Sequence, residues 1–334
     1  MTSTFRSPVL PLLLPLGLLL GACNSTTPKV DKQALLDMHR DQALGYYEAG
    51  ALGQAEDQIR KGLDIDPKDD NLKLMLGWCR QRRGTRDDLN VAERVFRDLA
   101  PRKDYRALLG LAECLERKGK LYAETADRIE AGEAETPSAD PKERALELRN
   151  DTRKFWKEAL THYQAVLEQK PTEGQAMNGL QRTHALLDEP EESLAWGGKL
   201  LAQSQSELDF WQNQLKRPDL GAKEEAQLRE RMTVTREVCV ATHFLISAHL
   251  VRLDRKAEAV EHLDAIVEMT PEESVAYSRR GQILHDLGRY EEARANLDDF
   301  LRITELPFDH PFVQRAFETK SDCERRLQAL GGGK

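Results

Sequence analysis

Small and apolar residues recur along the C-terminal part of the chain with a fixed period. Two ordered sets of five residues stand 34 positions apart; they are Ser247, Leu250, Ala259, Leu263 and Val267, and then Gly281, Leu284, Ala293, Leu297 and Leu301. Spacings of three, four and seven within such sets are typical of one face of a helix. A repeat of this length indicates stacked helix–turn–helix units, because one unit alone cannot bury its apolar side.

The same register predicts about six such units between residues 34 and 309. The small positions let two helices approach closely, and the large ones fill the remaining space. The last unit shows the pattern best, with Tyr277, Gly281, Leu284, Gly288, Ala293, Leu297, Phe300 and Pro307. This pattern resembles the tetratricopeptide repeat, which implies an all-α, right-handed solenoid. Arg80 departs from it, because it stands where the repeat normally has a bulky residue.

Two segments are longer than the repeat register allows. Gly119 and Ala159 are 40 residues apart, where the matching step from Gly288 to Ala293 is 5 residues. A similar excess follows Leu200. We expect each excess, near 120–154 and 204–236, to lengthen two neighbouring helices into a projecting hairpin, since the apolar stripe continues in phase past residue 151. The alternative is an eroded extra repeat at each place, with a reversal of the chain at residue 151.

The C-terminal end is expected to close the array. Residues 310–330 form a charged amphipathic pattern that predicts a polar capping helix, as repeat arrays require at their ends. Residues 331–334 are three glycines and a lysine, and we expect them to be a disordered tail.

The first 22 residues have the layout of an export signal. Arg6 and the amino terminus supply positive charge, and the apolar run from Val9 to Ala22 has 14 residues. This run is shorter than the roughly 20 residues that a membrane-spanning helix needs. It matches the apolar centre of a signal peptide, which is removed from the mature protein.

The end of this segment, Leu-Gly-Ala-Cys, resembles the bacterial lipobox. The resemblance implies that Cys23 becomes the acylated first residue, for example with palmitate, and that residues 23–33 are a lipidated tether. Asn24, in place of the aspartate that signals inner-membrane retention, implies the outer membrane facing the periplasm, or the cell surface in a host with one membrane. The alternative is an ordinary cleaved signal with an incidental cysteine.

Composition excludes some classes of function. The formal net charge of −8 argues against non-specific binding of nucleic acid, which needs a basic face. Few aromatic residues, 6%, beside 32% charged residues suit an elongated helical protein with a thin core. Cys79 and Cys114 occupy matching repeat positions and are expected to be buried apolar residues without a disulfide, whereas the sequence leaves the pairing of Cys239 with Cys323 open.

No constellation of catalytic or metal-binding residues is evident. None of the eight histidines is three or four residues from another, and CxxC, phosphate-binding and nucleophile-elbow motifs are missing. We therefore predict no enzyme activity, cofactor or metal. The rival interpretations are a cell-wall enzyme, which would need paired carboxylates in a pocket, and a structural subunit of a larger complex.

The resemblance places a protein-binding groove on the first helices of the repeats. The side chains that the register assigns to it are Arg40, Tyr47, Trp78, Asn178, Arg182, Phe244, Gln282 and His285. Trp78 is the strongest of these candidates, because an exposed indole gives both contact area and a donor. The sequence thus favours a membrane-anchored adaptor or assembly scaffold for other proteins, with a layout similar to lipoproteins that assemble outer-membrane barrels, secretins or pili.

Overall fold

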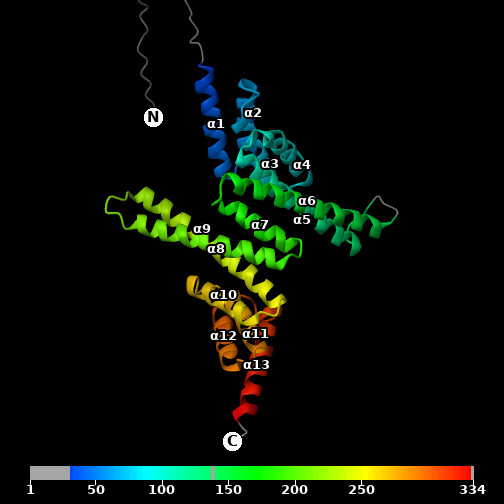
Figure 1. Cartoon of the computed structure of the whole chain (residues 1–334), viewed down its shortest axis with the longest axis vertical. Helices are drawn as coiled ribbons and strands as arrows, with labels where there is room; N and C mark the ends of the chain where they lie inside the picture. Colours follow the sequence, from blue (N-terminus) through cyan, green and yellow to red (C-terminus); the bar gives the residue numbers. More distant parts are fainter. Residues whose placement is uncertain (1–30, 137–139, 332–334) are drawn as a thin grey trace, which may run out of the picture.

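The described part of the chain, residues 31–136 and 140–331 of a computed structural model, is almost entirely helical (Figure 1). The helices are α1 (Lys32–Glu48), α2 (Leu52–Ile65), α3 (Asp70–Arg83), α4 (Arg86–Leu99), α5 (Tyr105–Glu130), α6 (Pro141–Gln169), α7 (Gly174–Leu186), α8 (Pro190–Leu215), α9 (Ala222–Arg252), α10 (Lys256–Met269), α11 (Ser274–Asp286), α12 (Tyr290–Ile303) and α13 (Pro311–Gly331), with a 3-10 turn at Ala100–Arg102. The expected signal segment and Cys23 lie outside the described residues. Within them, no helix combines the length and apolarity needed to cross a membrane.

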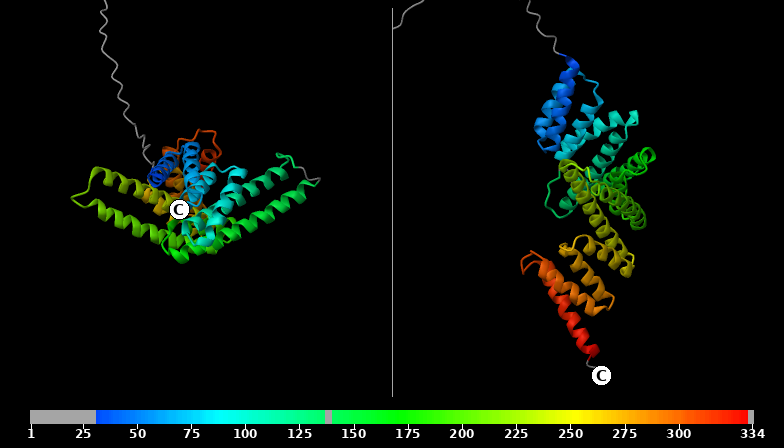
Figure 2. Two further views of the ribbon diagram at one scale, coloured as in Figure 1. Left: turned by 90° about the horizontal axis from the view of Figure 1, so that it is seen from above. Right: turned by 90° about the vertical axis from the view of Figure 1, so that its left-hand side faces the viewer.

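Consecutive helices pack as pairs, and the pairs stack along the long axis of the molecule (Figure 2). We call the first helices of the pairs, α1, α3, α5, α7, α9 and α11, the A helices. Neighbouring A helices also contact one another from α1 through α7, so they form a continuous layer. The prediction of an all-α solenoid is therefore confirmed.

Local sequence sets the helix ends. The side chain of Asp69 accepts a hydrogen bond from the backbone N–H of Leu72 and begins α3, and Thr85 caps α4 in the same way. Gly84 ends α3 with a φ of 73°, a left-handed conformation that favours glycine. These caps keep the turns short, so each pair of helices lies antiparallel.

The two long segments form helical hairpins that project on opposite sides of the stack (Figures 1 and 2). Their helices, α5, α6, α8 and α9, have 26, 29, 26 and 31 residues. Asp140 caps α6 and Pro141 opens it, and the helix then continues through Asp151 without a reversal. The hairpin hypothesis is thus confirmed, and an eroded repeat with a turn at residue 151 is excluded.

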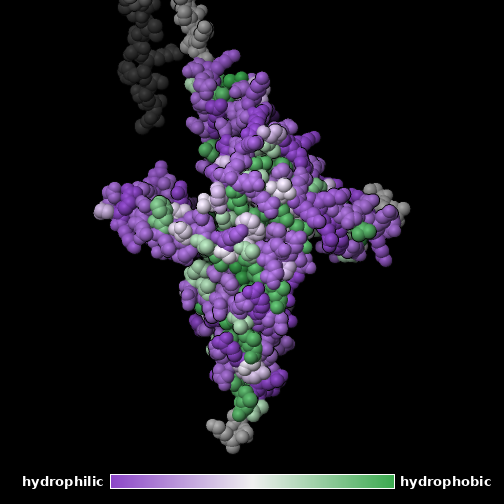
Figure 3. Space-filling model, in the orientation of Figure 1, coloured by the Kyte–Doolittle hydropathy of each residue, from purple (hydrophilic) through white to green (hydrophobic). Residues whose placement is uncertain are grey.

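Narrow apolar layers hold the hairpins together, while their outer surfaces are hydrophilic (Figure 3). In the first hairpin Ala126 and Ile129 of α5 meet Ala145 and Leu148 of α6. The same view shows apolar residues gathered along the centre of the molecule. The wide core therefore lies in the stack, and the hairpins are thin extensions of it.

The buried core also includes four cysteines and part of the capping helix. Cys79, Cys114, Cys239 and Cys323 are buried with free thiols, so the expected burial of the first two is confirmed. The capping helix α13 buries Val313 and Ala316 against the last pair. Its outer surface is less polar than expected, because Phe312 is 56% exposed and Phe308, in the preceding loop, is 69% exposed.

Glycine allows the closest approach between helices in the stack. A Cβ at Gly179 of α7 would lie 2.2 Å from the Tyr163 ring of α6, whereas a Cβ at the exposed Gly198 of α8 would meet nothing within 4 Å. We expect Gly179→Ala to lower the free energy of unfolding by about 1–3 kcal/mol, because the ring must move in a packed core.

Gly198→Ala provides the matched control, and urea unfolding measures both variants. Here the expected change is a gain of up to about 1 kcal/mol, since alanine has the better helix propensity. Equal stability of the two variants would contradict the close approach of α6 and α7.

Candidate functional site

A buried carboxylate lies at the centre of the A-helix layer. Glu116 of α5 is only 2% exposed. Arg182 of α7 donates two hydrogen bonds to it, at 3.1 and 2.9 Å, and the hydroxyl of Tyr163 on α6 donates a third at 2.9 Å. Lys120, one turn further along α5, approaches the other side at 2.8 Å. Three helices therefore converge on one side chain.

The charge state of this cluster follows from its neighbours. Burial alone would raise the pKa of Glu116, but the hydrogen bonds and positive charges of Arg182 and Lys120 outweigh it, so this pKa lies below its ordinary value. Burial raises the pKa of the nearby Glu113, which accepts a hydrogen bond from Gln81 at 3.1 Å. Glu116 is thus a permanent anion at neutral pH, held by two cations.

Two adjoining cavities open beside Arg182. The first has a volume of about 310 Å³ and a charged lining of Glu113, Glu116, Arg117, Lys120 and Arg182. The second has a volume of about 460 Å³ and lies between α7 and α9. Its lining is Lys120, Arg182, Ala185, Leu186, Leu245, Ala248, His249 and Arg252. Because they share Lys120 and Arg182, we treat the two cavities as one site and call it the central groove.

His249 is the unusual side chain in the central groove. It is 4% exposed, and neither ring nitrogen has a hydrogen-bond partner among the described residues. Burial, together with the nearby charge of Arg252, lowers the pKa of His249, so the ring is neutral at pH 7. A neutral imidazole offers one donor and one acceptor, and leaving both unused in a buried position is costly.

The structure brings only one of the predicted groove residues, Arg182, into this site. Arg40 is held by Asp69 at 2.6 Å, and the ring of Tyr47 lies under Arg82. Trp78 is half-buried and packs edge-on against Phe96, with ring centres 5.3 Å apart, so its indole is only partly exposed; its role as an anchor stays a prediction.

The other predicted residues also lie on A helices but belong to separate places. Asn178 lines a small cavity of mixed polarity beside α8, and Phe244 lies under Arg279 of α11, with 4.9 Å from guanidinium carbon to ring centre. Gln282 donates to Ser278 at 3.4 Å. His285 is 2.8 Å from Asp322 of the capping helix, which leaves it a structural contact.

The sequence missed the α9 side of the central groove. Leu245, Ala248, His249 and Arg252 follow the spacing i, i+3, i+4 and i+7, which puts them on one face of a helix. That signal was present in the sequence. The sequence did not show that this face lies against α7. The long insertion between the two helices interrupts the repeat spacing, so the spacing could not align α9 with α7.

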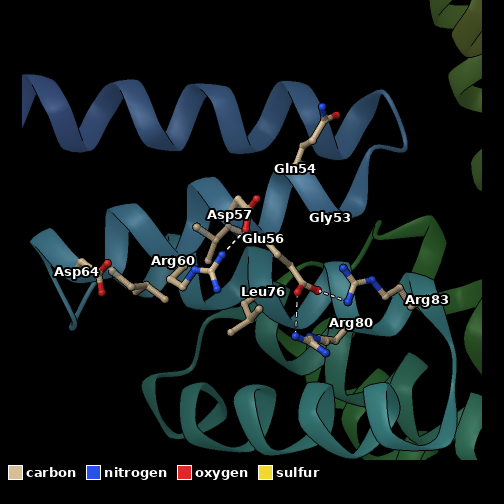
Figure 4. A pocket seen from close by; sticks show the side chains of 11 residues that line it. Gly53, Gln54, Glu56, Asp57, Arg60, Asp64, Leu76, Arg80 and Arg83 are labelled. Carbon is tan, nitrogen blue, oxygen red and sulfur yellow. Dashed lines mark hydrogen bonds and ion pairs between the residues drawn. The ribbon is translucent and has the colours of Figure 1, made fainter.

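A larger cleft, about 710 Å³, lies between α2 and α3 (Figure 4). The cleft forms at Arg80, which does not fill the core. At the equivalent position of other repeats, the leucines are buried in the core, namely Leu115, Leu250 and Leu284. Arg80 instead reaches Glu56 at 2.8 Å and Asp88 at 3.0 Å. Figure 4 shows Glu56 held between Arg80 and Arg83, so the charges of this cleft are largely neutralised within it.

Comparison with known proteins supports the repeat interpretation for one part of the chain. Residues 248–307, from the end of α9 to the loop after α12, match the family model described as tetratricopeptide repeat. No curated protein shows significant similarity to the sequence.

Solved structures of similar fold have low sequence identity to this chain. A thermophilic tetratricopeptide-repeat protein from Thermus thermophilus is 15% identical, with a TM-score of 0.44, and the alignment covers 76% of this chain and 98% of that one. The pilF protein of Pseudomonas aeruginosa is 12% identical, with a TM-score of 0.49 and coverage of 86% and 99%. PilW, described as a widely conserved type IV pilus biogenesis factor, is 16% identical, with a TM-score of 0.35 and coverage of 71% and 94%.

The pairing of buried Glu116 with partly exposed Arg182 predicts how stability depends on pH. Glu116→Gln should lower the free energy of unfolding at pH 7 by about 2 kcal/mol, because it removes charge-assisted hydrogen bonds to a buried carboxylate, while the Arg182 side chain, 37% exposed, can still be hydrated. Since the folded pKa of Glu116 lies below the ordinary value of 4.5, the stabilisation is complete above that value and is lost as pH falls through the folded pKa. The gap between wild type and variant should therefore narrow below pH 4.5.

Urea unfolding at a series of pH values measures this gap. Arg149→Gln is the matched control, because Arg149 binds Glu130 and Asp127 with side chains that are 42%, 45% and 65% exposed. Such surface pairs contribute less than about 1 kcal/mol. A gap that stays constant from pH 7 to pH 3 would show that the charge of Glu116 is not what stabilises the centre.

Proposed function

We propose that this protein is a non-catalytic adaptor that is anchored to a bacterial envelope membrane and binds other proteins in the central groove. Stacked helix pairs present an extended surface that suits the binding of other polypeptides. The match of residues 248–307 to the tetratricopeptide repeat agrees with this role. Among the described residues, no three metal-ligating side chains converge, and the charged groups of the groove bind one another.

The unpartnered ring of His249 carries the proposal. Both ring nitrogens are buried without a partner among the described residues, and a rotation of the ring toward the cavity that it lines would let them bind a donor and an acceptor of another molecule. A polypeptide backbone supplies both groups at each residue. The aliphatic side chains of Leu186 and Leu245 beside it offer a surface for an apolar side chain of the same segment.

The rim of the central groove adds a preference for charge. Lys120, Arg182 and Arg252 line the apolar cavity, although the chain as a whole is acidic. Glu116 already balances part of this charge through Lys120 and Arg182, and Arg252 is paired with Asp188. The groove therefore suits a segment with an aliphatic residue next to one or two acidic residues, and does not suit a basic segment.

Two labelled peptides of equal length test this preference, one alternating leucine with glutamate and one alternating leucine with lysine. We expect the acidic peptide to bind at least tenfold more tightly, and its binding to weaken as salt is added, because exposed charges are screened. Ala248→Trp should reduce its affinity at least tenfold, since the exposed Ala248 borders the apolar cavity and an indole would fill it.

Gln54→Trp is the control for this experiment. Gln54 is an exposed residue of the larger cleft between α2 and α3, so the variant adds the same indole at another hollow. Its affinity should stay within twofold of wild type, as measured by fluorescence anisotropy. Equal binding of both peptides, or loss of binding only in Gln54→Trp, would contradict the assignment of the central groove.

The anchor is a separate part of the proposal and rests on the sequence. Cys23 follows an export signal that ends in small residues, and Asn24 favours the outer membrane. Two or more acyl chains on one residue hold a protein firmly, because each buried methylene contributes about 0.8 kcal/mol.

Cys23→Ser should abolish incorporation of labelled palmitate and move the protein from the membrane fraction to the soluble envelope fraction. Cys79→Ser serves as the control, because Cys79 is buried and far along the chain from the signal; it should keep both the label and the membrane association. A Cys23→Ser protein that still fractionates with membranes would contradict the acyl anchor.

A further inference from the structure

Two histidines that are far apart in the helical register meet between α9 and α10. The Nδ1 atoms of His243 and His262 are 2.8 Å apart, and their ring centres are 5.1 Å apart. The two residues are 19 positions apart, so helical spacing gave no sign of a pair. The pair arises because the turn between α9 and α10 brings the two helices side by side.

The apolar contact between these helices fixes the position of the pair. Ile246 and Leu250 of α9 pack with Ala259 and Leu263 of α10 in one buried cluster. His243 lies one turn before Ile246, and His262 directly precedes Leu263. The rings therefore meet at the edge of a packed core, where both are half-buried and within reach of solvent.

Both imidazoles are neutral at pH 7. Burial lowers the pKa of His243 to about 4 and also lowers the pKa of His262. In the neutral pair one Nδ1 carries a proton and donates it, and the other Nδ1 accepts through its lone pair. Neutral imidazole nitrogen is also the form that binds a transition metal.

We propose that His243 and His262 form a two-histidine site for a borderline transition-metal dication such as Zn²⁺ or Cu²⁺, bound through both Nδ1 atoms. Zn–N bonds of 2.0–2.1 Å at a tetrahedral angle need Nδ1 atoms about 3.3 Å apart. That separation is about 0.5 Å more than in the hydrogen-bonded pair, a change that side-chain rotation supplies. Hard cations such as Mg²⁺ prefer oxygen ligands and do not suit this pair.

Metal binding at this site releases no net proton. The ring that donates from Nδ1 must free that atom, and its proton moves through solvent to Nε2, so each imidazole keeps one proton and the metal keeps its charge. No third side chain among the described residues converges on the pair, so water completes the coordination. Glu258, one turn before His262, is already paired with Arg255 at 2.7 Å, so we do not count it as a ligand.

The consequence is a metal link between the two helices of one repeat. It would join α9, which forms one wall of the central groove, to α10, and it would stabilise the folded pair in proportion to metal occupancy. This inference is independent of the proposed function, because it concerns residues outside the groove.

Calorimetric titration of the full chain in detergent with Zn²⁺ alone tests the site. Wild type should show one site that His243→Gln and His262→Gln each weaken at least tenfold. Glutamine can still hydrogen-bond the remaining imidazole, so the fold should persist. His162→Gln is the matched control, because His162 faces the carboxylate of Glu158 at 3.5 Å with no second imidazole; its affinity should stay within twofold of wild type.

Further measurements test whether both imidazoles bind the metal. The heat of Zn²⁺ binding should not depend on the ionisation enthalpy of the buffer, since no net proton is released, and Zn²⁺ but not Mg²⁺ should raise the unfolding midpoint of wild type. With Cu²⁺, the electron paramagnetic resonance spectrum should show coupling to two imidazole nitrogens. Coupling to a single nitrogen, or equal Zn²⁺ affinity in wild type and His262→Gln, would overturn the proposal.

Discussion

One buried anion joins three helices at the centre of the stack. Glu116 is held by Arg182, Tyr163 and Lys120, so α5, α6 and α7 share one buried charge. A buried carboxylate loses its hydration, and only well-placed hydrogen bonds and positive charges offset that cost. The contact therefore favours one particular arrangement of the three helices. Apolar layers tolerate small shifts, but two directed hydrogen bonds to one carboxylate do not. Arg182 and Lys120 also line the central groove, so the side chains that join the three helices also shape the groove.

Much of the architecture could be predicted from the sequence, because the information is local. The 34-residue period fixes the helix pairs, and Asp140 with Pro141 fixes the start of α6. The continuous apolar stripe across Asp151 correctly favoured a hairpin. The outer surface of α13 was less predictable, since the exposed Phe312 does not disturb the periodicity that identifies a helix.

The sites were harder to predict, because they depend on contacts between distant segments. The repeat register assigns Arg182 to a groove, but its partner Glu116 is 66 positions earlier and carries no motif. Trp78 has the chemistry of an anchor, yet Phe96 of the paired helix α4 packs against the indole and leaves it half-buried. His243 and His262 are isolated in the helical spacing, because only the turn between α9 and α10 brings them together.

The hairpins have a mechanical consequence for the centre of the molecule. Helix α9 forms one arm in its first half and the wall with Leu245 and His249 in its second, and α5 likewise carries Glu116 and then runs out into the opposite arm. The uninterrupted α9, with 31 residues, is about 46 Å long and stiff over that length. A force applied to the tip of either hairpin therefore acts as a torque on the wall of the central groove, because the stiff arm works as a lever.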